Sequence, residues 1–362
     1  MKMYPALAVA ALSSVAGLAQ AQSTVTIFGI ADLGILSTSA SGSGSVMSLN
    51  ADGNTSSRLG FRGTEDLGGG LKANFHLEGA VSLDSGTGGT SNLNNKDANV
   101  GSNGFTFGRR STLGLASNWG EVRLGRDYVP SFNNLTTAGH PFGTNGVGNA
   151  GQMYYPVNAG GTSVRTTVRA SNSVSYFTPS GLGGFTGHVM VAMGEQASNA
   201  VAAGRDISKD GGHLGARIAY GAGPLYLSFA SGKTNYATGD FTQTNFAANY
   251  KFGPTKLMYL WGQNKVGVTK TTSNMVGTQW TVGTGEVRFA YTTLTADKVA
   301  NDANQWAIGY VHNLSKRTAL YTNYSQVKNK GTGKQFAVGG GNSVTDAGGS
   351  STGFEAGVRH SF

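Results

Sequence analysis

The segment that most constrains the fold is 352–362, at the end of the chain, where apolar and polar side chains alternate. Thr352, Phe354, Ala356 and Val358 share one parity, and Gly353, Glu355, Gly357 and Arg359 share the other. A period of two residues is typical of a β-strand with one apolar and one polar face. Because the pattern runs up to the terminal Phe362, we expect the last strand to lie inside a sheet.

The same alternation recurs along the whole chain and predicts an all-β protein. It favours about sixteen strands of roughly ten residues each, a length that suits the wall of a barrel in a membrane. The expected spans are 24–36, 55–65, 70–82, 104–117, 120–127, 167–179, 184–194, 211–221, 223–232, 241–252, 255–265, 273–282, 285–294, 303–313, 316–328 and 352–362. The evenness of this series leaves no place for a second domain.

The connections between these segments alternate between short turns and long loops. Short turns lie at 118–120 and 253–254, whereas 37–54, 84–104 and 329–351 are long and rich in Gly, Ser, Thr and Asn. Turns on one side and loops on the other indicate a membrane barrel and argue against a soluble β-sandwich.

Parity also predicts which side chains face outwards. In the second expected strand, Leu59 and Phe61 oppose Arg58, Gly60 and Arg62, and the apolar set should face lipid. Aromatic residues near strand ends are expected to form rings at the two membrane interfaces. They are Phe28, Trp119, Tyr128, Tyr176, Tyr250, Tyr259, Tyr310 and Phe362.

Composition narrows the class of protein further. The chain has 57 glycines, no cysteine and only 12% charged residues. Without disulfides, an exported chain gains stability from another source, and closed hydrogen bonding in a membrane provides one. The formal net charge is +9, but the basic residues are scattered singly and form no nucleic-acid-binding cluster. We therefore expect them to line a pore.

The first residues predict an exported protein. Lys2 precedes an apolar run from Ala6 to Leu18, and the small-x-small pattern Ala19-Gln20-Ala21 follows. This pattern predicts a secretory signal peptide over 1–21, cleaved before Gln22. Beyond it, no apolar run is long enough for a transmembrane helix, so strands must cross any membrane.

Several segments together resemble a known family, the general-diffusion porins of β-proteobacteria. They are 22–29, 57–73, 120–128, 141–144 and 172–176, with the terminal Phe362. The resemblance implies a 16-stranded antiparallel transmembrane β-barrel over 22–362 in the outer membrane of a Gram-negative bacterium. It also implies a homotrimer that passes small hydrophilic solutes, and contact with lipopolysaccharide. In that family the last strand closes the barrel, and Phe362 is expected to be read by the periplasmic and outer-membrane assembly machinery.

The resemblance further implies that the third long loop, about 129–161, bends into the barrel and narrows it. Pro130, Pro141 and Pro156 discourage strands there. His140 stands before Pro141 and Phe142, where an acidic residue is often found in the family. The loop consequently has no carboxylate, which weakens any side of the constriction that would attract cations.

Arginines near this loop are the candidate selectivity residues. The resemblance implies a cluster of three wall arginines facing the loop: Arg58, Arg110 (or its neighbour Arg109) and Arg169. Arg62, Arg123 and Arg165 have the parity or position to join them. A guanidinium group is always charged and presents a planar fork to carboxylate or phosphate-like anions. These arginines therefore predict a channel that prefers anions. The alternative is that each arginine pairs with a barrel acid such as Glu65, Glu78 or Asp127.

Enzyme chemistry has little support in the sequence. The six histidines show no metal-ligand spacing, and no nucleophile elbow precedes a helix. We expect no catalytic residues, no metal and no cofactor. The alternatives are a barrel that acts mainly as an adhesin or receptor through its loops, and an outer-membrane hydrolase.

Overall fold

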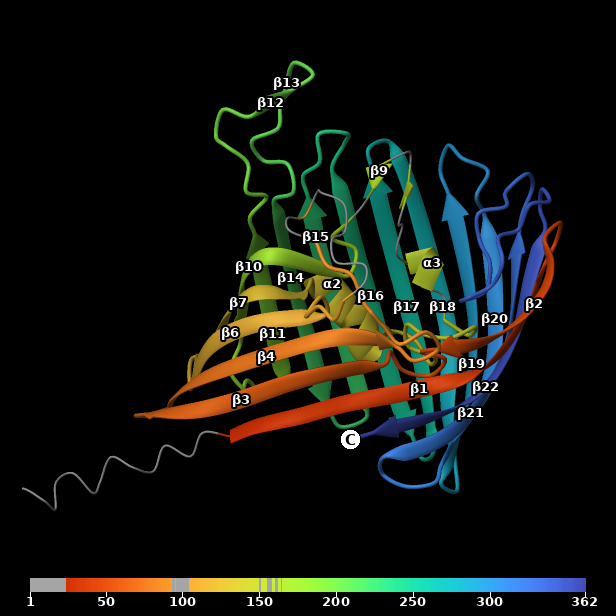
Figure 1. The fold of residues 1–362 in the computed structure, drawn as a ribbon, viewed down its shortest axis with the longest axis horizontal. Coiled ribbons are helices and arrows are strands. Elements are labelled where there is room, and N and C mark those ends of the chain that lie inside the picture. The colour runs from red at the N-terminus through yellow and green to blue at the C-terminus, as the bar shows by residue number, and fades with distance from the viewer. Residues whose placement is uncertain are drawn as a thin grey trace, which may run out of the picture.

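The computed structural model describes residues 24–92, 95, 104–149, 151–154, 158–159, 162–163 and 165–362. The expected signal peptide, 1–21, lies outside these residues. Within the described ranges, sixteen antiparallel strands form a closed β-barrel, which confirms the predicted fold class (Figure 1). Helical pieces among them are confined to the third loop: α2 (Pro130–Asn134), the π-helical η1 (Leu135–Gly139) and α3 (Gly151–Tyr154).

Every barrel strand overlaps one of the expected spans. The strands are β1 Thr24–Ala40, β3 Arg58–Gly68, β4 Leu71–Ser82, β6 Arg110–Ser117, β7 Gly120–Tyr128, β10 Arg169–Phe177, β11 Phe185–Ala192, β14 His213–Ala222, β15 Leu225–Thr234, β16 Phe241–Phe252, β17 Thr255–Val266, β18 Thr269–Val282, β19 Gly285–Ala296, β20 Ala303–Asn313, β21 Thr318–Asn329 and β22 Ser350–Ser361. The largest boundary error is six residues, at β6, which begins at Arg110 whereas the expected span began at residue 104; the other boundaries differ by four residues or fewer.

Short additional strands extend the loops. β2 (Gly44–Ala51) forms a hairpin with the end of β1, inside the span 37–54 that was expected to be a loop. β5 (Thr87–Gly88) pairs with the end of β4. The pairs β8 (Asn158–Ala159) with β9 (Thr162–Ser163), and β12 (Val201–Ala202) with β13 (Arg205–Asp206), form small separate sheets.

The barrel closes between its first and last strands. β1 pairs with β3 over Thr24–Ile30 and with β22 over Ile30–Ala40. Phe362 continues the β22 pairing, because its N–H donates to the Gly29 carbonyl and its own carbonyl accepts from the Gly29 N–H, each at 3.1 Å. Closure removes the exposed edges that an open sheet would present.

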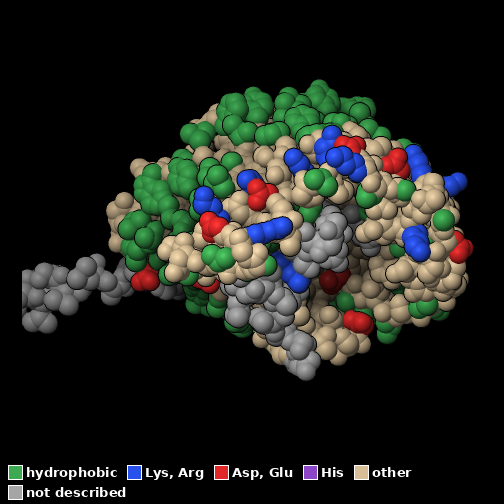
Figure 2. Space-filling model, turned by 90° about the horizontal axis from the view of Figure 1, so that it is seen from above, with side chains coloured by type: hydrophobic (Ala, Val, Ile, Leu, Met, Phe, Trp, Pro, Cys, Tyr) green, Lys and Arg blue, Asp and Glu red, His purple; other side chains and the backbone are tan. Residues whose placement is uncertain are grey.

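Side chains alternate across the wall as expected. On β6, Leu113 and Leu115 point outwards and are 61% and 47% exposed, whereas Thr112 points inwards and is buried. Seen from above, apolar side chains cover the flank of the barrel, while charged ones gather nearer the mouth (Figure 2). The interfacial assignment of Phe28 and Tyr128 was wrong, since both rings lie under lumen arginines.

The buried apolar core lies inside the barrel, between the third loop and the wall. Loop residues Phe132, Leu135, Phe142, Val147, Met153 and Tyr154 pack in one cluster with wall residues Met190, Met258, Leu260 and Met275. Inward-facing apolar side chains on these strands therefore form a seat for the loop. Within the part of the chain that the structure describes, no helix is long and apolar enough to span a membrane.

Candidate functional site

The third loop is fastened to the wall by hydrogen bonds from its first turn onwards. Pro130 occupies the first turn of α2, where its missing N–H costs nothing. The Ser131 hydroxyl donates to Gln243 Oε1 on β16 at 2.6 Å, and the Asn134 amide donates to Asn245 Oδ1 at 2.7 Å. These contacts hold α2 against the β16 region of the barrel.

The later part of the loop is tied to strands further round the ring. The Ser273 hydroxyl on β18 donates to the Met153 carbonyl at 2.6 Å. The Val147 N–H donates to the carboxylate of Glu355 on β22 at 3.1 Å. Because the loop is held on the β16–β22 side, the remaining gap lies against β3, β4, β6, β7 and β10.

His140, Pro141 and Phe142 face the wall and not this gap. Phe142 is 3% exposed and belongs to the buried core. Glycines make room for the pair: a β-carbon at Gly277 would lie 2.6 Å from Pro141, and one at Gly309 would lie 2.9 Å from the Phe142 ring. Burial lowers the pKa of His140 to about 3, so His140 is uncharged at neutral pH. These three residues seat the loop.

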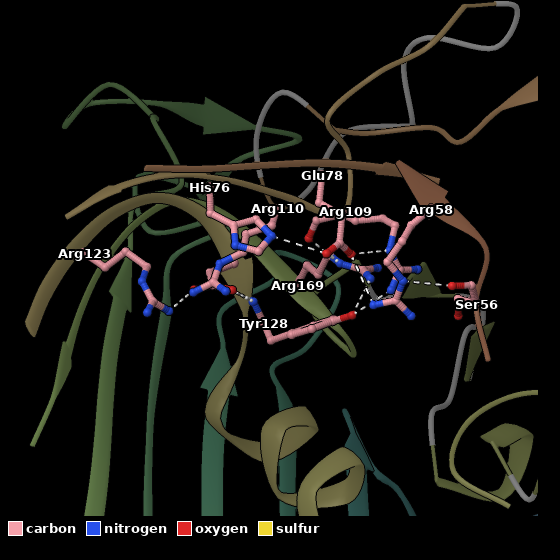
Figure 3. A network of polar contacts seen from close by, with 10 residues as sticks. Ser56, Arg58, His76, Glu78, Arg109, Arg110, Arg123, Tyr128 and Arg169 are labelled. Carbon is pink, nitrogen blue, oxygen red and sulfur yellow. Dashed lines mark hydrogen bonds and ion pairs between the residues drawn. The ribbon is translucent and has the colours of Figure 1, made fainter. Parts of the chain in front are cut away.

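Arg58, Arg109 and Arg169 line one cavity in the gap (Figure 3). Its volume is about 490 Å³, and the loop contributes Phe132, Thr136, Thr144 and Asn145 to the facing side. Among the described residues that line this cavity there are three arginines and no carboxylate. The structure thus brings Arg58 and Arg169 together with Arg109. Of the two adjacent arginines that the sequence offered for this position, Arg109 and Arg110, Arg109 is the one that lines the cavity.

Glu78, on β4, is the carboxylate that the constriction arginines share. Its Oε1 accepts from Arg109 Nε at 2.6 Å and lies 3.4 Å from Arg58 Nη1. Its Oε2 lies 3.3 Å from His76 Nε2. One negative charge is therefore shared by two guanidinium groups. The alternative expectation, that each arginine pairs with a barrel acid, is met only in part.

Arg169 has no carboxylate within ion-pair distance among the residues described. Its Nε donates to the Arg109 carbonyl at 2.7 Å, and its Nη2 donates to the Tyr128 hydroxyl at 3.0 Å. The Tyr128 hydroxyl also accepts from Arg109 Nη2 at 3.0 Å. The Arg169 guanidinium lies 4.5 Å over the Tyr128 ring. Tyr128 thus orients two arginines without neutralising either.

The other candidate arginines lie elsewhere. Arg110 and Arg123 both reach Asp127, at 3.2 and 2.6 Å, and with Arg62 they line a different cavity. The side chain of Arg165 lines neither cavity, and its backbone N–H donates to the Tyr236 hydroxyl at 3.0 Å. The structure therefore divides the candidate arginines into two groups. Arg58, Arg109 and Arg169, together with Tyr128, form the constriction cluster, and Arg62, Arg110 and Arg123 line the second cavity.

Two members of the constriction cluster were missed or misplaced by sequence reasoning. Tyr128 was expected at the membrane interface, although as the last residue of β7 it can turn inwards. Arg109 precedes β6, so strand parity does not apply to it. The sequence pointed to them only through their neighbours. Tyr128 follows Asp127 and Arg109 precedes Arg110, and both neighbours face inwards.

A closed β-barrel with a loop folded inside and a charged gap beside that loop defines a diffusion channel of the bacterial outer membrane. A family model described as Gram-negative porin matches residues 6–332. The chain belongs to this family.

The chain is similar to known porins along nearly its whole length. It is 39% identical to "Outer membrane porin protein 32" of Delftia acidovorans, covering 100% of this chain and 99% of that protein. It is 29% identical to an outer membrane porin protein of Bordetella pertussis, covering 98% of this chain and 99% of that protein. The solved "Anion-selective porin from Comamonas acidovorans" superimposes with a TM-score of 0.79 at 38% identity, covering 94% and 100%.

A more distant structure, OmpF of Salmonella typhi, shares the fold alone, with a TM-score of 0.61 at 15% identity over 93% of this chain and 97% of that one. The protein is an outer-membrane porin, a passive channel that crosses the outer membrane with its strands. The family, fold and location expected from the sequence are confirmed. The relatives are channel proteins and not enzymes.

Proposed function

We propose that this porin passes small hydrophilic solutes with a preference for anions, and that Arg58, Arg109 and Arg169 create the preference. The observation that carries the proposal is the cavity beside the third loop, which three arginines line and no described carboxylate lines. The similar porin from Comamonas acidovorans is called anion-selective. The facing loop contributes no ionised side chain, since His140 is neutral.

The expected strength of this preference suits conduction. Two unit charges 4 Å apart interact by about 1 kcal/mol in water and by roughly 4 kcal/mol at an intermediate dielectric. Glu78 offsets part of the field of Arg58 and Arg109, and Arg169 keeps its full charge. An anion is therefore favoured severalfold or more at the narrowest point and is still released.

Reversal potentials in asymmetric potassium chloride test the proposal. Wild-type channels should pass chloride better than potassium, most strongly at low ionic strength, because salt screens fixed charges. Replacing Arg58 and Arg169 together with serine should move the reversal potential towards cations without unfolding the barrel, since lumen side chains tune selectivity more than stability. A wild type that prefers potassium, or a double variant with an unchanged potential, would remove these residues from the role.

We also propose a homotrimer surrounded by lipopolysaccharide. Supporting it are exposed apolar side chains on β1 and β2, where Val25, Ile27 and Met47 are 68%, 62% and 75% exposed. Such a face is suited either to another copy of the chain or to lipid. Chemical cross-linking in outer-membrane vesicles should give a band at three times the monomer mass. Its absence at any reagent concentration would contradict the trimer.

We propose cleavage of the leader after Ala21. The basis is the charged start, apolar run and small-residue ending described above. Mass spectrometry of the outer-membrane protein should then find Gln22 as its first residue.

A further inference from the structure

The second cavity, of about 400 Å³, lies on the side of the constriction where the short turns are. Cross-strand pairing builds its wall in two rows of inward-facing side chains. One row runs Thr26, Arg62, His76 and Thr112 across β1, β3, β4 and β6. The other runs Thr24, Thr64, Asn74, Gly114 and Arg123. Directly paired residues lie about 5 Å apart on one face, so each row is continuous.

Most of the charge in this cavity is already paired. Arg123 binds the Glu121 carboxylate through Nε at 3.1 Å and Nη2 at 2.8 Å. Its Nη1 lies 2.6 Å from Asp127, which also accepts from Arg110 at 3.2 Å. Two arginines are thus matched by two carboxylates, and this group adds no net charge.

Arg62 carries the unpaired positive charge. Its side chain is exposed to the lumen, and its guanidinium lies 4.9 Å from the centre of the Phe28 ring. No carboxylate approaches it within ion-pair distance in the described part of the chain. A ring face leaves the edge of the guanidinium, with its N–H donors, free for a planar anion.

Neutral donors surround the same space. The Thr64 hydroxyl donates to Asn74 Oδ1 at 2.9 Å, so the Asn74 amide nitrogen keeps both its hydrogens for another acceptor. Thr24, Thr26 and Thr112 add hydroxyl groups to the lining. At position 114 the absence of a side chain keeps the row open, since a β-carbon there would lie 2.9 Å from Glu121 Oε1.

The second cavity is separate from the constriction. The two cavities share no lining residue among those described. Arg58 and Arg62 lie four residues apart on the same face of β3, which places their backbones about 13 Å apart along the strand. This exceeds the screening length of roughly 8 Å at physiological salt, so each arginine presents its own minimum to an anion.

We propose that the cavity around Arg62 is a second anion-binding station, which holds a small oxyanion such as inorganic phosphate after it has passed the constriction. The proposal rests on the anion preference proposed above and adds a site on the short-turn side. An anion there accepts from Arg62, Asn74 and the threonine hydroxyls. Two weak sites in series allow one anion to displace another, which favours release over trapping.

Phosphate block of chloride current, measured in single oriented channels, tests the station. Inorganic phosphate added on the short-turn side should reduce chloride current in the wild type, with a voltage dependence that places the site before the constriction. Arg62→Gln should weaken this block about tenfold, because it removes a charge-assisted contact. The chloride preference in asymmetric salt should persist in the variant, since Arg58, Arg109 and Arg169 are intact.

Lys256→Gln is the matched control. Lys256 shares the inward parity of the buried Met258 and Leu260 on β17, away from the Arg62 wall, and its loss removes one lumen charge. The control should leave phosphate block unchanged. Chloride preference in the wild type without phosphate block, or equal weakening by both variants, would overturn the station alone. Preference for potassium in the wild type would instead overturn the proposed anion-selective function on which the station depends.

Discussion

At the scale of single residues, the net charge of the constriction depends on Glu78. Its carboxylate is within 3.4 Å of both Arg58 and Arg109 and is the one acidic group that the described constriction arginines contact. Glu78→Gln should therefore raise the preference for chloride. A unit charge about 8 Å from an ion changes the energy of that ion by about 0.5 kcal/mol in water, with opposite signs for chloride and potassium. The ratio of chloride to potassium permeability should therefore rise roughly fivefold.

Reversal potentials measure this change directly. Glu195→Gln, in the loop after β11, removes the same charge at a distance from the constriction and serves as the control. An unchanged reversal potential in Glu78→Gln would mean that the arginines do not set selectivity through their net charge.

Strand parity predicted these residues only where regular strand continues. It placed Arg58 and Arg62 on the inner face because β3 is regular there. It failed for Arg109, which comes before β6, and for Tyr128, which ends β7. The bond from Arg169 to the Arg109 carbonyl joins residues 60 apart in sequence, and alternation carries no information about such contacts.

At the scale of elements, the third loop depends on a buried carboxylate. Glu355 is 2% exposed, and its Oε1 accepts both the Val147 N–H at 3.1 Å and the Asn323 amide at 2.8 Å. Glu355→Ala leaves both donors unpaired and should weaken the seating of the loop by about 1–3 kcal/mol. Single-channel records should then show frequent brief changes of conductance.

Glu355→Gln separates hydrogen bonding from packing. It keeps an oxygen acceptor of the same length, so its records should lie near those of the wild type. If the conductance of the alanine variant fluctuates no more often than that of the wild type, the carboxylate does not anchor the loop.

His140 makes the same element sensitive to acid. Burial holds its pKa at about 3, below the ordinary value of 6.5, so a released loop binds a proton more readily than a seated one. The stability of the seated loop is therefore complete above about pH 6.5 and declines as the pH falls towards 3. Conductance fluctuations should increase between pH 7 and pH 4, and His140→Asn should flatten that increase. Equal pH dependence in both proteins would contradict this role for His140.

The inward fold of this loop was predictable only from the resemblance. Its prolines discourage long strands, and the described part of the loop forms the short helices α2, η1 and α3. The seat itself was not predictable. Met190, Met258 and Met275 face inwards at positions where alternation predicts lumen-facing polar residues, and their partners lie in the loop.

At the scale of the whole molecule, a barrel inverts the usual arrangement of a globular domain. Apolar side chains such as Leu113 and Val191 are exposed on the outside, and the core lies inside beneath the third loop. The wall does not depend on that core, because its backbone groups pair strand to strand around the ring. The pairing of β1 with β22 is then the step that completes the ring. Alternation up to Phe362 predicted that the last strand lies in a sheet, and the resemblance to the porin family supplied its partner.

The last pairing at this seam requires both a terminal aromatic and a residue without a side chain. Gly29 exchanges two backbone hydrogen bonds of 3.1 Å with Phe362, and a β-carbon built on Gly29 would overlap the Phe362 ring. Deleting Phe362 and replacing Gly29 with valine should therefore have the same effect, a fall in the amount of folded, heat-modifiable protein in the outer membrane. Gly104→Val is the control, because a β-carbon there meets no atom within 4 Å in the described part of the chain. Electrophoresis of unheated and heated membrane samples measures the folded fraction. If Gly29→Val folds normally and the deletion does not, Phe362 acts through recognition during assembly and not through its pairing with Gly29. If both variants fold normally, this pair does not close the barrel.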